Sequence, residues 1–124
     1  MKSTIAMSRG ILVLDENLLD LKDFLIERNI KVIVPRNGLS DDAIMQELLS
    51  HRIFLTANSK DFIHEVSSYE FGLISADNVK NTPAKELAGI VSKAIIAYSL
   101  WAKRHGFLLV LRQDGKHQYK DLTE

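Results

Sequence analysis

The sequence predicts a three-layer α/β domain with a mainly parallel central sheet, helices on both faces and a C-terminal β-hairpin. In the first half, short apolar runs alternate with segments whose apolar residues recur at helical spacing. This is the pattern of strands buried on both faces and of the helices that connect them. Near the end, two strand-like segments flank Asp114-Gly115, a dipeptide typical of a tight hairpin turn.

The composition fits one globular domain. Of the 124 residues, 46% are apolar and 26% are charged, close to the usual globular values. The chain has no cysteine, which excludes disulfides, thiol catalysis and thiolate metal sites and fits a reducing compartment. Sixteen basic and sixteen acidic residues cancel, so the net charge indicates no partner class. We expect residues 1–9 to form a flexible tail and residues 10–124 to form a single cytoplasmic domain with no membrane segment.

Four apolar runs are expected to form the parallel strands. They are Ile11–Leu14, Lys31–Val34, Ile53–Thr56 and Phe71–Ser75. Three helical segments lie between them: one that carries Leu18, Leu21 and Leu25, a second over Asp41–Ser50, and a short third from about Ser59. Ser40 is a suitable N-cap for the second helix.

The second half predicts one long helix followed by the hairpin. Thr82 is expected to cap the helix, with Pro83 at its first position. Apolar residues keep helical spacing as far as Arg104, and Gly106 is expected to end the helix. The two hairpin strands are then expected over 107–111 and 117–122.

Three acidic residues follow three of the predicted strands. Asp15 and Asp61 lie just past the first and third strands, and Asp41 follows the second after a short loop. Each of them alone is well explained as a helix-capping or first-turn residue. If the strands are neighbours, however, the three carboxylates gather at the edge of the sheet where ligands bind. Clustered carboxylates repel one another unless a cation binds them, so the pattern predicts a divalent metal site and phosphodiester chemistry.

Three motifs resemble a known family in their order and spacing. They are Leu14–Leu18, Gly38–Ile44 and Phe54–Phe62, and together they are similar to small PIN-like domains, which are related to VapC-type toxin ribonucleases. The strand at 71–75, the long helix and the terminal hairpin are also similar to the PIN-like pattern. The resemblance covers roughly residues 10 to 122.

The resemblance implies a metal-dependent endoribonuclease that cleaves single-stranded RNA with Mg²⁺ or Mn²⁺. Asp15, Asp41 and Asp61 would be the catalytic carboxylates and metal ligands, and Asn58 would be a further ligand. Many relatives have Asp where this chain has Asn58, so the site has one negative charge fewer. The secondary candidates are Glu16, Asn17, Asp42 and Thr56.

The resemblance also implies partners. These are the RNA substrate, a cognate antitoxin protein of a type II toxin–antitoxin pair, and a second copy of the chain in a homodimer. Phosphate contacts require only mobile cations. The candidates for RNA contact are Arg36, Lys60, Arg112 and Lys116. Basic residues at exposed positions of this kind are more often ordinary solvated surface.

Two alternatives come from other functional classes. The first is a catalytically inactive PIN-like module that binds a protein partner, and Asn58 is the residue that favours it. The second is a phosphoacceptor receiver domain, whose acidic pair resembles Asp15 and Glu16. A receiver domain requires an aspartate at the end of the third strand, where this chain has Thr56, and a lysine after the fifth strand, where it has Arg112.

Overall fold

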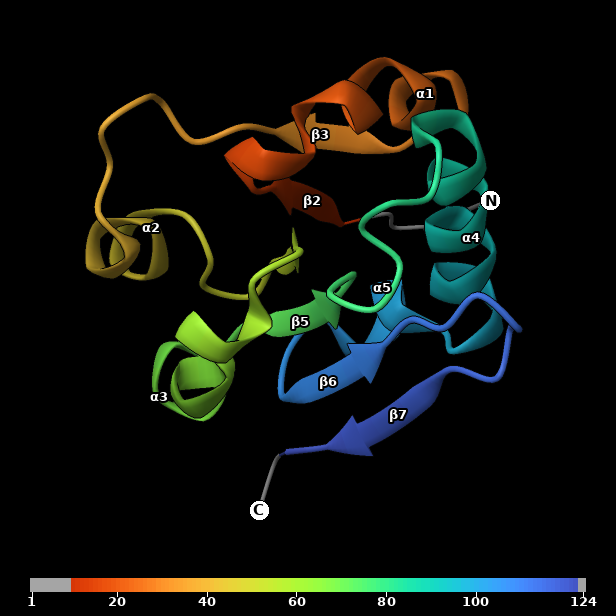
Figure 1. The fold of residues 1–124 in the computed structure, drawn as a ribbon. Helices are drawn as coiled ribbons and strands as arrows, with labels where there is room; N and C mark the ends of the chain where they lie inside the picture. Colours follow the sequence, from red (N-terminus) through yellow and green to blue (C-terminus); the bar gives the residue numbers. More distant parts are fainter. Residues whose placement is uncertain (1–9, 123–124) are drawn as a thin grey trace, which may run out of the picture.

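The computed structural model describes residues 10–122, so the tail predicted over residues 1–9 lies outside the described residues. Within that range, six strands form one sheet in the order β3-β2-β4-β5-β6-β7. Neighbouring strands are parallel from β3 to β6, and β7 is antiparallel to β6. The predicted α/β class with a mainly parallel sheet is therefore confirmed (Figure 1). The strands are β2 Ile11–Leu14, β3 Lys31–Ile33, β4 Ile53–Thr56, β5 Gly72–Ser75, β6 Phe107–Val110 and β7 Gln118–Asp121.

Helices lie on both faces of this sheet (Figure 1). Helices α1 and α4 pack on one face, and α2 and α3 pack on the other. The helical segments are η1 Glu16–Leu21, α1 Lys22–Glu27, α2 Asp41–Glu47, η2 Ser59–Asp61, η3 Ile63–Glu65, α3 Val66–Tyr69, α4 Ala84–Ala97 and α5 Leu100–Lys103, with η marking 3₁₀ turns.

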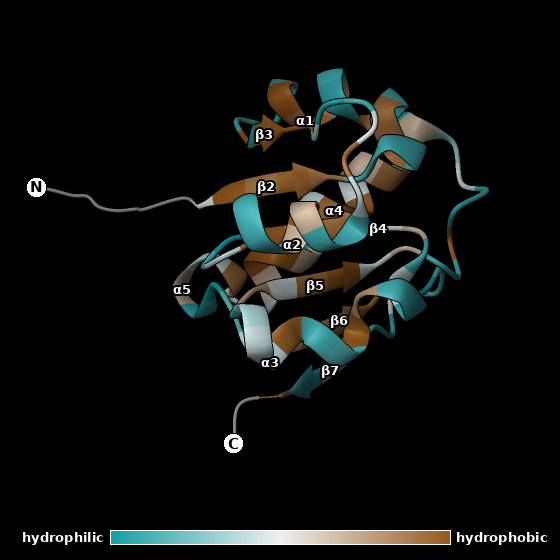
Figure 2. Cartoon of the chain, turned by 90° about the vertical axis from the view of Figure 1, so that its left-hand side faces the viewer, coloured by the Kyte–Doolittle hydropathy of each residue, from teal (hydrophilic) through white to brown (hydrophobic). Residues whose placement is uncertain are grey.

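The strand side chains divide between two cores. In β2, Leu12 and Leu14 belong to the core under α1 and α4, whereas Val13 belongs to the core under α2 and α3. The same alternation holds in β4, where Phe54 lies on the opposite face from Leu55. Figure 2 shows these apolar strands between the helices. Burial on both faces is the reason that the runs contain almost no polar residues.

Helix α4 differs from the prediction at both of its ends. Thr82 does not cap it, because Pro83 occupies the N-cap position; the Thr82 hydroxyl instead accepts a hydrogen bond of 3.2 Å from the Gln113 amide. The helix ends at Ala97 and does not continue to Arg104. Ser99 has a left-handed φ of 53° and breaks the helix before α5. The break turns Leu100 into the core, where it is fully buried.

Two shorter helical segments also differ in part from the prediction. The Ser40 hydroxyl accepts a hydrogen bond of 3.1 Å from the Ala43 backbone, which confirms the predicted N-cap of α2. That helix ends at Glu47, before the predicted Ser50, and Leu49 just beyond it is fully buried. The short helix predicted from Ser59 consists of two 3₁₀ turns followed by α3.

The order of the strands identifies where a ligand is expected to bind. Counted along the described chain, the strand order is 2-1-3-4-5 with an antiparallel sixth strand at the edge. In such doubly wound sheets the connections diverge between the first and third strands, and a crevice opens beyond their carboxyl ends. In this protein that position lies between β2 and β4.

Candidate functional site

Asp15 lies at this divergence point and is bonded to both strands. Its backbone N–H donates to the carbonyl of Leu55 at 3.0 Å, one step beyond the end of β2. One carboxylate oxygen caps η1 by accepting from the Glu16 N–H at 2.8 Å, and the other accepts from the Thr56 hydroxyl at 2.5 Å. Asp15 is therefore both a helix cap and a side chain fixed at the end of β4.

Thr56 organises the turn that follows β4. Its side chain is fully buried, and its hydroxyl oxygen accepts a hydrogen bond of 3.0 Å from the Asn58 N–H while donating to Asp15. The Asn58 side-chain amide in turn donates to the carboxylate of Asp61. A continuous set of hydrogen bonds thus runs from Asp15 through Thr56 and Asn58 to Asp61.

Asp41 begins α2 on the other side of the same edge. The pKa of its carboxyl group is raised above the ordinary value of 3.8, in part by the two carboxylates just described. Partial burial raises the pKa most, followed by four negative charges, which are in decreasing order those of Asp61, Asp15, Asp42 and Glu16. The carboxylates of Asp15 and Asp61 are therefore close enough to Asp41 to disfavour its ionisation.

The three carboxylates do not form a closed cage of metal ligands. Over residues 10–122, no group of three histidine, cysteine or acidic side chains has the arrangement that holds a metal ion. Of the secondary candidates, Glu16 and Asn17 are exposed on η1, and Asp42 is exposed in the first turn of α2. Thr56 acts through its hydrogen bonds, since its buried side chain presents no free surface.

The four candidate RNA contacts are exposed but dispersed. Arg36 lies in the loop before α2, and Lys60 lies in η2 beside Asp61. Arg112 and Lys116 lie in the loop between β6 and β7. The Arg112 guanidinium donates to the Gln118 side chain at 3.2 Å, so part of its hydrogen-bonding capacity is already used.

Sequence reasoning missed Asp77, which supports the turn after β4. Its carboxylate accepts from the Ser59 backbone N–H at 3.1 and 3.2 Å and from the Ser59 hydroxyl at 2.8 Å. The Asp77 N–H donates to the hydroxyl of Ser75 at 3.4 Å, as Asn58 does to Thr56. The available signal was this repetition, since Thr-Ala-Asn ends one strand and Ser-Ala-Asp ends the next.

Replacing Asp41 with asparagine should raise the free energy of unfolding at neutral pH. Because the pKa of Asp41 is raised by folding, the folded protein holds this proton more tightly than the unfolded chain does. Ionisation therefore costs stability above the ordinary pKa of 3.8, and the advantage of the variant should vanish as the pH falls below that value. Urea unfolding at several pH values measures the difference.

Asp23→Asn is the matched control for this variant. It removes an exposed first-turn carboxylate from α1 instead of α2. A first-turn carboxylate normally stabilises a helix by about 0.3–1 kcal/mol, so the control should be less stable than the wild type at neutral pH. If Asp41→Asn also lowers stability at neutral pH, the carboxylate serves α2 alone and feels no acidic cluster.

No family model, curated protein or solved structure matches the chain. Among the helices of residues 10–122, none is long and apolar enough to cross a membrane.

Proposed function

We propose that this protein is a PIN-like, metal-dependent endoribonuclease that cleaves single-stranded RNA, as the toxin of a type II toxin–antitoxin pair. The proposal rests on one observation above all. Two carboxylates tied to the ends of neighbouring strands, Asp15 and Asp61, lie in the electrostatic range of a third, Asp41, where a doubly wound sheet binds its ligands. The resemblance of the three sequence motifs supports the same conclusion.

The donor set fits a hard divalent cation. Mg²⁺ usually binds through one or two carboxylates and completes its shell with water and substrate phosphate oxygens, so a cage of three protein ligands is unnecessary. Asp15 and Asp61 are the residues that would hold it, and Asp41 adds negative charge at the same edge. When bound, the cation supplies activation of water and neutralisation of charge on the phosphate.

The chain itself contributes the positioning of these groups. Thr56 holds one Asp15 oxygen, and Asn58 holds the carboxylate of Asp61. Asp77 fixes the turn that carries both Asn58 and Asp61 through its bonds to Ser59. Rigid placement matters because reacting groups contribute most when they are already oriented.

Addition of Mn²⁺ should raise the melting temperature of the wild-type protein. A ligand that binds only the folded state stabilises it by about 2.7 kcal/mol at a concentration of 100 times its Kd, which is several degrees for a domain of this size. Asp15→Asn should lose most of this shift, whereas the control Glu27→Gln, at the end of α1, should retain it. Scanning calorimetry with and without Mn²⁺ measures it, and an equal shift in both variants would contradict the metal site.

The inactive PIN-like module is the second candidate. Asn58 supports this second candidate, because its side-chain amide donates a hydrogen bond to the carboxylate of Asp61 and adds no negative charge to the site. A flat melting temperature in Mn²⁺, together with no cleavage of single-stranded RNA, would favour this module. A receiver domain shares the strand order 2-1-3-4-5, but at the end of β4 it would need an aspartate in place of the buried Thr56.

The partners follow from the proposed role. An antitoxin that neutralises the enzyme is expected to cover the acidic edge, and the second copy of a homodimer is expected to leave that edge free. The RNA substrate would approach the edge from surfaces that carry cations. Besides the four residues named from the sequence, Arg28, Lys85 and Lys93 line one such surface between α1 and α4.

A further inference from the structure

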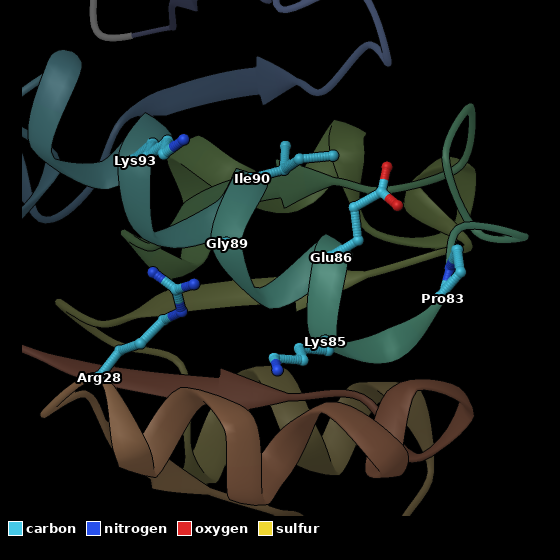
Figure 3. Close-up of a pocket in the computed structure, with 7 residues that line it drawn as sticks. All are labelled: Arg28, Pro83, Lys85, Glu86, Gly89, Ile90 and Lys93. Carbon is cyan, nitrogen blue, oxygen red and sulfur yellow. The ribbon is translucent and has the colours of Figure 1, made fainter.

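A groove lies between α1 and α4, on the face of the sheet opposite α2 and α3 (Figure 3). Its volume is about 580 Å³, and its open end faces solvent. Three cations and one carboxylate line it, beside two apolar residues and a glycine. The lining residues are Arg28, Pro83, Lys85, Glu86, Gly89, Ile90 and Lys93.

The cations are arranged along one stripe of α4. Lys85, Gly89 and Lys93 are spaced four residues apart, so they lie on the same side of the helix. Arg28, which ends α1, reaches across the groove toward Gly89, the middle member of the stripe (Figure 3).

The positive charge of the groove is compensated only in part. Among residues 10–122 the recorded ion pair joins His51 and Glu70, far along the chain from this groove, and no hydrogen bond engages the three cationic side chains. Glu86 is the single acidic residue in the lining. The lining therefore has a net positive charge, which favours the binding of an anionic ligand.

Gly89 gives Arg28 the room it needs. Glycine in the middle of a helix destabilises it relative to alanine, so Gly89 is an unfavourable choice for α4 unless it serves packing or function. A Cβ atom at this position would lie 3.2 Å from Nη2 of Arg28, closer than ordinary contact. The glycine thus allows the guanidinium to lie close to the backbone of α4 at the groove.

A separate cavity carries a further cation near the candidate site. Its volume is about 440 Å³, and Asn17, Asn58 and Lys80 are among its lining residues. Asn58 is the residue that holds Asp61, and Lys80 lies in the segment that leads into α4. Lys80 thus lies beside the candidate site, and Lys85 and Lys93 follow it in the chain on one side of α4.

We propose that this row binds successive phosphates of a single-stranded nucleic acid and directs the strand to the acidic edge. A row of separate cations suits a chain of regularly spaced phosphates better than one small anion. Proteins that bind single strands combine such a row with apolar surfaces for the bases, and Ile90 and Pro83 supply an apolar wall here. The inference deepens the proposed function by naming the path of its substrate.

Binding is tested without cleavage, on protein that carries Asp15→Asn, in EDTA. Fluorescence anisotropy of a short labelled single-stranded RNA is followed over a range of salt concentrations. Lys85→Ala and Lys93→Ala should each weaken binding severalfold and lower the slope of log K against log salt by about 0.7. Lys31→Ala, an exposed cation on β3, is the matched control and should change neither quantity.

Gly89→Ala tests the groove without changing any charge. The added Cβ should displace the guanidinium of Arg28, which is exposed and free to move, and so weaken RNA binding. The melting temperature should not fall, because alanine favours the helix. Weaker binding in a protein that is at least as stable would exclude unfolding as the cause.

The outcomes separate the groove from the nuclease. Equal losses in Lys85→Ala and Lys31→Ala would overturn the groove, because diffuse charge would then explain the binding. Stronger displacement of the RNA by a polyglutamate peptide than by unlabelled RNA would also overturn it, in favour of an acidic protein partner. If inorganic phosphate displaces the labelled RNA as well as unlabelled RNA does at the same concentration, the groove is a site for free phosphate and the proposed RNA path is overturned. If the groove variants lose binding while the wild type cleaves no RNA with Mg²⁺ or Mn²⁺, the groove stands and the proposed nuclease falls.

Discussion

Asp15→Asn should lower metal-dependent cleavage of single-stranded RNA by about a hundredfold or more. A cation that stabilises charge in the transition state contributes several kcal/mol, and each 1.36 kcal/mol corresponds to a factor of about ten in rate. The substitution removes the carboxylate that is fixed at the ends of both β2 and β4. Initial rates on a labelled RNA, measured in Mg²⁺ and again in EDTA, give the size of the loss.

The fold of this variant should survive, which makes the test interpretable. An asparagine oxygen still accepts from the Glu16 N–H, since asparagine caps helices as well as aspartate does. The Thr56 hydroxyl can rotate to accept a hydrogen bond from the new amide. Glu27→Gln, which removes a carboxylate from the end of α1, should keep the full rate. Full activity in Asp15→Asn would remove the site assignment.

Gly72→Ala should destabilise the protein by about 1–3 kcal/mol, the usual cost of inserting a methyl group into a filled core. Gly72 begins β5 and pairs with Phe107 of β6. A Cβ atom there would lie 2.3 Å from Cε2 of the Phe107 ring, which is fully buried and has no room to withdraw. Urea denaturation, with the midpoint compared at constant slope, measures the loss.

A second substitution identifies the cause of this loss. Phe107→Leu removes the ring that the new methyl group would strike, at the cost of a cavity. The double variant should therefore lose less stability than the sum of the two single variants, because each change relieves the other. Gly72→Ala with wild-type stability would show that β5 and β6 can separate locally, and that the close contact does not constrain this part of the sheet.

The central strands were the most predictable part of the fold. The bounds of β2 and β4 match the apolar runs Ile11–Leu14 and Ile53–Thr56, because a strand buried on both faces has apolar residues throughout. The break between α4 and α5 was not predictable, since Tyr98 and Trp101 continue the helical spacing. It depends on the burial of Leu100 in a core that the local sequence does not reveal.

The candidate site was predictable only in its backbone placement. The sequence places Asp15 and Asp61 just after strands, and it therefore brings them to one edge of the sheet. The bonds that orient them are long-range: Thr56 is 41 residues from Asp15, and Asp77 is 18 residues from Ser59. The cationic groove was missed for the same reason, because Arg28 and Lys85 belong to helices that meet only in the folded protein.

The position of β2 between β3 and β4 has a consequence for synthesis of the chain. This strand is made first among the described strands, yet its partner β4 ends at Thr56, 41 residues after Asp15. At roughly 5–20 residues per second, a ribosome needs about 2–8 s to supply that partner. During this interval three fully apolar side chains, Leu12, Val13 and Leu14, lack the strand that later covers one of their sides. A nascent chain of this protein is thus expected to be a chaperone client until β4 emerges, and to become independent of that protection soon afterwards.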